Sequence, residues 1–298
     1  MSKIIKKLNK WKSLVLHLKH QFKKNELTAL GAQLSYYLIL SFFPFLIILI
    51  VLLNFTRLTE GQTINQLSYI LPDEVFQLTL TILDEIRSGL NATLLSVSSI
   101  ATIWAASKGT SALIKGLNKA YNVSENRSFL RLRAMGIVFT FALVFIIIFS
   151  LFSLVFGRLI GLAVSEYLGI SEAFLSLWEY MRYGIPLLVL FFIFTLLYRI
   201  GPNYPLSFKD VYPGAIFTTL GWIIISLIFA FYVNNYGAFS RLYGSIGAVI
   251  VLLIWLNISS LIVLIGGEIN ATRLWYKNNN NHKTDQASDP SSVDTFSQ

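Results

Sequence analysis

The last apolar stretch of the chain, residues 244–266, reads GSIGAVIVLLIWLNISSLIVLIG and contains no charged residue. About 20 apolar residues are enough for one helix to cross the ~30 Å hydrocarbon core of a bilayer. The crossing segment must be helical, because an isolated strand would leave its backbone groups unpaired in lipid. This stretch therefore predicts a transmembrane helix.

Five further stretches have the same character, at about residues 32–53, 92–114, 134–156, 183–198 and 214–233. The chain has 24 Lys and Arg and 15 Asp and Glu, and of these only Lys108 lies inside any of the six stretches. The 298 residues are 55% hydrophobic and only 13% charged, whereas a soluble domain carries about 25% charge. The predicted fold class is all-α: a polytopic membrane protein with a bundle of six transmembrane helices. A soluble enzyme and a disordered regulator are excluded.

The basic residues outside the six stretches are distributed unevenly. Arg57, Arg87, Arg158, Arg182 and Arg241 fall on one side of the membrane, and all the others except Lys108 fall on the other side. Lys and Arg concentrate in cytoplasmic loops of membrane proteins. The pattern predicts a cell-membrane protein with both termini in the cytoplasm. It also accounts for the net charge of +9 without a nucleic-acid partner.

The chain divides into three parts: residues 1–26, 27–276 and 277–298. Apolar residues recur at three- and four-residue spacing among lysines in the first part: Ile4, Leu8, Trp11, Val15, Leu18 and Phe22. This pattern predicts an amphipathic helix lying on the inner leaflet, bound to anionic phospholipid headgroups. The alternative is a helix packed on the cytoplasmic ends of the spans.

Two other segments differ from the spans. Residues 54–91 are too long for a simple turn, and they predict one or two helices on the outer leaflet. The last part, residues 277–298, is polar and contains four consecutive Asn, so we expect it to be disordered.

Lys108 is the first candidate functional residue, because it is the only charge within a span. A charge at the bilayer centre costs at least ~2.5–3.5 kcal/mol on insertion scales. Three interpretations remain open: an ion pair with Glu268, a side chain that snorkels to the headgroups, or a place on a substrate or ion path.

Other polar residues in or beside the spans could share such a path. They are Gln33, Tyr36, Ser107, Asn257, Glu268 and Asn270. Gln33 and Tyr36 precede Pro44, which should kink or loosen the first span. The alternative for each is structural, since polar side chains in membranes also hydrogen-bond between helices. Small residues at four-residue spacing in 92–114 favour close helix packing there.

Several chemistries have no support in the sequence. The chain has no Cys, no phosphate-binding or dinucleotide-binding glycine motif and no HExxH zinc motif. Its three His residues do not form a plausible metal set. We therefore expect no catalytic residues, no cofactor and no metal.

Several motifs together resemble the YihY/BrkB family of bacterial inner-membrane proteins. They are Leu30-Gly31-Ala32-Gln33-Leu34-Ser35-Tyr36-Tyr37 followed by Ser41-Phe42-Phe43-Pro44, then Ala106-Ser107-Lys108-Gly109, Leu117-Asn118-Lys119-Ala120-Tyr121, Tyr198-Arg199-Ile200-Gly201-Pro202 and Gly266-Gly267-Glu268-Ile269-Asn270-Ala271. The resemblance implies six spans and no established activity. It also carries a virulence-linked label and an earlier filing as ribonuclease BN. RNA cleavage is not expected, because the segments outside the spans offer no acid–base pair or metal cluster.

These observations leave two functions open. The first is a transporter or exporter of a lipid or an envelope-related solute, which would use the polar residues named above. The second is a non-transporting scaffold that organises the envelope. Both are compatible with a homo-oligomer.

Overall fold

The computed structural model describes residues 2–55, 80, 92–169, 172–236 and 246–288. Within these ranges the chain is helical and contains no strand. The all-α fold class is thus confirmed. Most of the segment 54–91, for which outer-leaflet helices are predicted, lies outside the described residues.

Each predicted span falls in or overlaps one long helix. The helices are α1 (Ser2–Lys24), α2 (Leu27–Phe55), α5 (Ala92–Ala120), α6 (Phe129–Leu168), α7 (Glu172–Ile200), α8 (Phe208–Tyr236) and α10 (Ile246–Ser288). The segments Phe174–Ile200, Phe208–Val233 and Val249–Asn279 are each long and apolar enough to cross a membrane. The fold is that of a membrane protein, and the count of six crossings stays a prediction.

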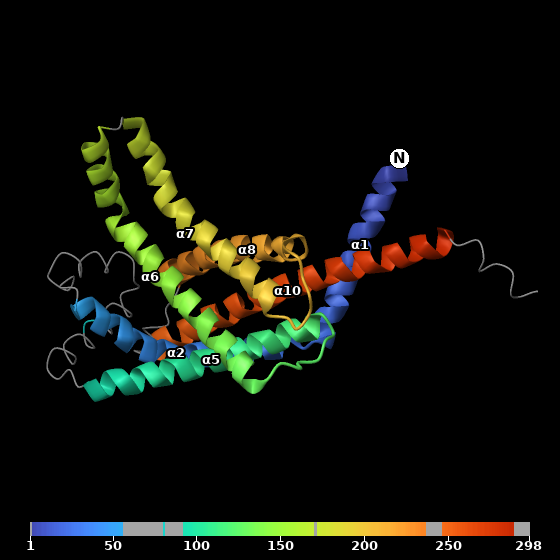
Figure 1. Cartoon of the computed structure of the whole chain (residues 1–298), viewed down its shortest axis with the longest axis horizontal. Coiled ribbons are helices and arrows are strands. Elements are labelled where there is room, and N and C mark those ends of the chain that lie inside the picture. Colours follow the sequence, from blue (N-terminus) through green and yellow to red (C-terminus); the bar gives the residue numbers. More distant parts are fainter. Residues whose placement is uncertain (1, 56–79, 81–91, 170–171, 237–245, 289–298) are drawn as a thin grey trace, which may run out of the picture.

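The helices form two associated groups (Figure 1). α2, α5 and α10 run side by side, with α8 packed on α10. α6 and α7 form an antiparallel hairpin that packs on α5 and α8 and then extends away from them at a steep angle. α1 crosses α10 near the end of the bundle where the α5–α6 and α7–α8 connections also lie. We call this the α1 end.

Local signals explain several boundaries. Ser128 caps the start of α6, its side chain accepting a hydrogen bond from the Arg131 N–H. Gly169 ends α6 in the left-handed conformation, φ 63°, which costs glycine little. α2 continues through Pro44, so the expected loosening does not end that helix.

Two buried apolar clusters hold the α1 end together. The larger joins α5, α6, α7 and α8 around Leu117, Leu197, Tyr198, Val211 and Ala215. The smaller consists of Leu27, Leu30 and Leu264, at the contact of α2 with α10. We call this smaller group the leucine cluster.

The end of the chain differs from expectation. α10 continues to Ser288, so residues 277–288 are helical rather than disordered. A helix that has already formed extends by one backbone hydrogen bond per added residue, which favours continuation past the apolar part. The remaining residues, 289–298, lie outside the described part of the chain.

Candidate functional site

The turn between α1 and α2 places a polar side chain inside the bundle. Asn25 N–H donates to Gln21 O at 2.8 Å, and Glu26 N–H donates to Lys23 O at 3.2 Å. Glu26 adopts φ 54°, a left-handed conformation that turns the chain sharply. As a result Asn25 is buried, with 6% of its surface exposed, while Glu26 remains outside.

Asn25 is the hydrogen-bond partner of Glu268. Its Nδ2 donates to Glu268 Oε1 at 2.5 Å. Glu268 has no exposed surface, and its second oxygen, Oε2, has no hydrogen-bond partner. A buried carboxylate with an unsatisfied oxygen is costly unless a proton, a water or a ligand completes it. Glu268 is therefore the chemically most unusual group in the described chain.

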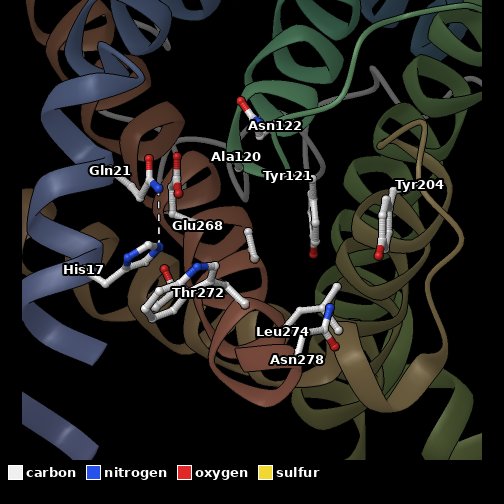
Figure 2. Close-up of a pocket in the computed structure, with 12 residues that line it drawn as sticks. His17, Gln21, Ala120, Tyr121, Asn122, Tyr204, Glu268, Thr272, Leu274 and Asn278 are labelled. Carbon is white, nitrogen blue, oxygen red and sulfur yellow. Dashed lines mark hydrogen bonds between the residues drawn. The ribbon is translucent and has the colours of Figure 1, made fainter. Parts of the chain in front are cut away.

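Glu268 lines a cavity of about 190 Å³ at the α1 end (Figure 2). The cavity lies between α1, the end of α5, the α7–α8 connection and α10. Its lining comprises His17, Gln21, Ala120, Tyr121, Asn122, Tyr204, Glu268, Ala271, Thr272, Leu274, Trp275 and Asn278. Figure 2 shows His17 and Gln21 on one side, Tyr121 and Tyr204 on the other, and residues of α10 between them.

Two hydroxyl groups of the lining share the unusual state of Glu268. Tyr121 Oη and Thr272 Oγ1 are both buried and have no hydrogen-bond partner. Thr272 follows Glu268 by four residues, so both side chains lie on the same face of α10. Three residues of the lining thus each have a buried polar atom without a hydrogen-bond partner.

The α1 wall of the cavity is held by stacking. The His17 and Trp275 rings are parallel, with centroids 3.9 Å apart and planes 9° apart. His17 also shares a hydrogen bond of 3.3 Å with Gln21. Burial lowers the pKa of His17, and the nearby charges of His20 and Lys24 lower it further. The neutral imidazole is therefore favoured at neutral pH.

The opposite wall is aromatic. Tyr121 and Tyr204 stack with centroids 5.8 Å apart. Burial raises the pKa of Tyr121, and the negative charges of Asp210 and Glu268 add to the effect. Tyr121 consequently keeps its proton and remains a hydrogen-bond donor.

A polar clamp fixes this aromatic wall. Arg127 donates to both carboxylate oxygens of Glu125, and also to the carbonyls of Ile200 (3.1 Å) and Gly201 (2.7 Å) at the end of α7. The adjacent Arg127 guanidinium lowers the pKa of Glu125 to about 2. Asn118 donates to Glu125 and accepts from the Asn203 N–H at 2.7 Å. The loops carrying Tyr121 and Tyr204 are thereby tied to each other.

The structure separates the predicted functional residues. Lys108 is exposed on α5, with its Nζ 5.8 Å from the centroid of the Trp104 ring. It forms no ion pair with Glu268, whose partner is Asn25. Gln33 and Tyr36 are exposed on α2, so neither faces a path inside the bundle.

The remaining three lie at helix contacts. Ser107 is fully buried where α5 approaches α6, and its hydroxyl has no partner. Asn257 donates to Ser35 Oγ at 3.4 Å, joining α10 to α2. Asn270 accepts from the Gly214 N–H and donates to Val211 O, joining α10 to α8. Only Glu268 of the predicted set reaches the cavity.

Several residues that line the cavity or contact Glu268 are not predicted from the sequence. Asn25 and Thr272 carry no pattern that marks them, because their role depends on which helix lies opposite. Tyr121 belongs to a motif quoted above, and His17 drew attention only as a metal ligand. α1 covers part of α10 and so encloses the cavity, and no local sequence pattern predicts this packing.

The fold and the cavity define a helical membrane protein with a buried polar site at one end of its bundle. The family model for virulence factor BrkB matches residues 18–291. The chain therefore belongs to the BrkB family, as its sequence motifs indicate.

Named relatives agree with this membership. A protein of Bacillus subtilis named as ribonuclease-like, YfkH, is 41% identical over 87% of this chain and 94% of its own length. A UPF0761 membrane protein of Haemophilus influenzae is 30% identical over 52% of this chain and 55% of its own length. One from Pseudoalteromonas translucida is 32% identical over 26% of each chain. No solved structure matches the chain.

Proposed function

We propose that the protein is a transporter or exporter that moves a lipid or an envelope-related solute across the membrane. The observation that carries the proposal is the cavity at the α1 end, which reaches a fully buried carboxylate with one unsatisfied oxygen. Burying ionisable groups in membrane bundles is costly, and such groups usually mark substrate or ion pathways.

A second observation supports a path beyond the cavity. Ser260 lies eight residues before Glu268 on the same face of α10, about 12 Å further along the helix. Its hydroxyl is buried without a partner, and the Asn257–Ser35 hydrogen bond lies one turn beyond. Leu264 stands between Glu268 and Ser260, within the leucine cluster. In this proposal the leucine cluster is the closed gate between two polar regions.

Proteoliposomes test the proposal directly. The full chain is reconstituted with phospholipids labelled on an acyl chain, and transbilayer movement is followed by the loss of fluorescence to an impermeant quencher. We expect faster movement than in protein-free liposomes, slower movement for Glu268→Gln, and several-fold faster movement for Leu264→Ala. Leu190→Ala, a buried leucine away from the cavity on α7, is the matched control and should behave as wild type. Wild-type liposomes that behave like empty ones would contradict the proposal.

RNA cleavage, which the name of the Bacillus relative suggests, is not part of the proposal. Hydrolysis of RNA needs an acid–base pair or a metal site that a phosphodiester can reach. A cavity of about 190 Å³ is too small to admit an RNA strand.

The α6–α7 hairpin supports the second candidate, an envelope-organising scaffold. α6 has 40 residues, which span about 60 Å, twice the ~30 Å apolar thickness of a bilayer. Tyr167 and Tyr180 near its tip are 89% and 78% exposed. If scaffolding is the function, replacing both tyrosines by Ala should raise the detergent sensitivity of growing cells while lipid movement in liposomes is unchanged.

A further inference from the structure

The three unpartnered polar atoms in the lining of the cavity can all accept hydrogen bonds from a ligand. Glu268 Oε2 is an acceptor when ionised, and the hydroxyls of Tyr121 and Thr272 can each accept as well as donate. Glu268 and Thr272 are more than nine-tenths buried. A group with several N–H donors and a positive charge matches this set, because charge-assisted hydrogen bonds to a carboxylate are the strongest kind available.

The charges of the lining residues themselves favour one positive charge, and Lys24, which is not among them, lies close enough to His17 to lower its pKa. Glu268 is the only carboxylate among the lining residues, and the neutral form of His17 adds no opposing charge. In the described part of the chain, no three His, Asp or Glu side chains gather as metal ligands would. The arrangement thus suits a monovalent cation better than a divalent metal.

The aromatic lining favours an organic cation. Tyr121, Tyr204 and Trp275 all line the cavity, and cations are attracted to the faces of such rings at distances up to about 6 Å. The volume of about 190 Å³ admits a small headgroup rather than a large molecule.

We propose that this cavity binds a primary ammonium group, whose N–H groups donate to Glu268 Oε2 and Thr272 Oγ1 on one face of α10, while the rest of the ligand lies against Tyr121 on the facing wall. The inference rests on the proposed function, since it names the substrate class of the same cavity. The ammonium group belongs either to a free amine or to an aminophospholipid headgroup. Lys24 and His20 near His17 would contact the phosphate of the second source.

Thermal unfolding of the purified full chain in detergent tests binding. The probe is ethanolamine hydrochloride, with sodium chloride at equal ionic strength and ethylene glycol as controls that lack the ammonium group. We expect ethanolamine to raise Tm and the controls not to. In Glu268→Gln the amide oxygen can still accept from Asn25, so the fold is kept while affinity falls about tenfold or more.

Matched variants separate binding from folding. Glu26→Gln, an exposed neutral replacement in the same turn, should keep the wild-type response. Thr272→Val and Tyr121→Phe each remove one hydroxyl and should weaken binding several-fold; they also serve if Glu268→Gln fails to fold. In lipid nanodiscs, a Tm gain on adding phosphatidylethanolamine to phosphatidylglycerol identifies the headgroup as the source, and a response to free ethanolamine alone identifies a soluble amine.

Three results would overturn the inference: no response of the wild type to either source, an equal response to sodium chloride, or an undiminished response in Glu268→Gln, Thr272→Val and Tyr121→Phe. If the protein moves lipid but does not bind the ammonium probe, only the inference about the ammonium group is refuted. Intact binding in a protein that moves no lipid would uphold it and remove the proposed function.

Discussion

Glu268 and Asn270 are two residues apart on α10, both fully buried, and they face different neighbours. Two residues turn a helix by about 200°. Both polar atoms of the Asn270 amide are hydrogen-bonded to backbone groups of α8, on either side of Pro213. Glu268 accepts a hydrogen bond from Asn25 through Oε1, and among the described residues its Oε2 has no partner. Asn270 therefore joins α10 to α8, whereas Glu268 is the residue to which the proposed binding is assigned.

The Glu125–Arg127 pair is the strongest ionic contact in the clamp, and it yields a prediction on pH. Glu125→Gln should lower the free energy of unfolding by about 1–3 kcal/mol at neutral pH, because a hydrogen-bonded charge pair is lost. The pKa of Glu125 is lowered from 4.5 to about 2 in the folded state, so between these values the unfolded chain binds more protons. The contribution is fully present above about pH 4.5 and is lost as the pH falls toward 2.

Chemical unfolding in detergent at several pH values measures this difference between wild type and variant. Glu26→Gln is the control, since Glu26 forms an exposed pair with Lys119 and such pairs contribute little. A wild-type advantage that grows on acidification would be incompatible with the lowered pKa.

At the scale of elements, α8 and α10 meet at glycines. A side-chain atom on Gly214 would overlap Gly266 O and the Asn270 amide, and one on Gly266 would overlap Thr218 and Tyr198. Small residues allow such close approach between helices in membranes. The contact places Asn270 within reach of the α8 backbone.

Gly214→Ala should therefore destabilise the protein by more than about 2 kcal/mol, because a backbone carbonyl cannot move aside cheaply. Gly184→Ala, in α7, is the matched control: an added Cβ there meets nothing within 4 Å. Since Ala favours helix over Gly by up to about 1 kcal/mol, this control should be neutral or stabilising. Tm values in detergent distinguish the two, and equal values would argue against the close contact.

The amphipathic pattern of α1 is compatible both with packing on the bundle and with binding to the lipid surface. Its last turns pack on the bundle through His17 on Trp275 and through Phe22 on the leucine cluster. This agrees with the alternative of a helix packed on the spans. Binding of its lysines to anionic lipid stays a prediction.

At the scale of the whole molecule, the end of α1, the α5–α6 loop and the continuation of α10 lie together, and the α6–α7 tip lies away from them (Figure 1). The sequence predicts that the first group is cytoplasmic. The chain has no Cys, which provides a clean background for labelling.

Single-cysteine variants test this topology. Ser13→Cys on α1 and Asn278→Cys on α10 should react with an impermeant maleimide only after cells are permeabilised, and Tyr167→Cys should react in intact cells. All three positions are exposed, so accessibility depends on the side of the membrane. Opposite labelling of Ser13→Cys and Asn278→Cys would refute the predicted placement of both termini.

Residue composition and the length of the apolar stretches are enough to predict the helices and the membrane location. Uninterrupted apolar stretches in lipid can satisfy their backbone groups only as helices, so composition and length suffice. Glu268, which the sequence singles out as a polar residue at the end of a span, lines the cavity in the structure. The hydrogen-bond partner of Glu268 could not be predicted from the sequence, because no sequence pattern favours Asn25 over Lys108 in that role.

Which polar groups contact one another depends on how the helices turn and pack. The turn at Glu26 carries Asn25 inward, the rotation of α5 carries Lys108 outward, and the crossing of α1 over α10 encloses the cavity. Helix–helix contacts depend on side-chain shape and on small residues that let backbones approach. These contacts join residues far apart in the chain, and no local pattern records them.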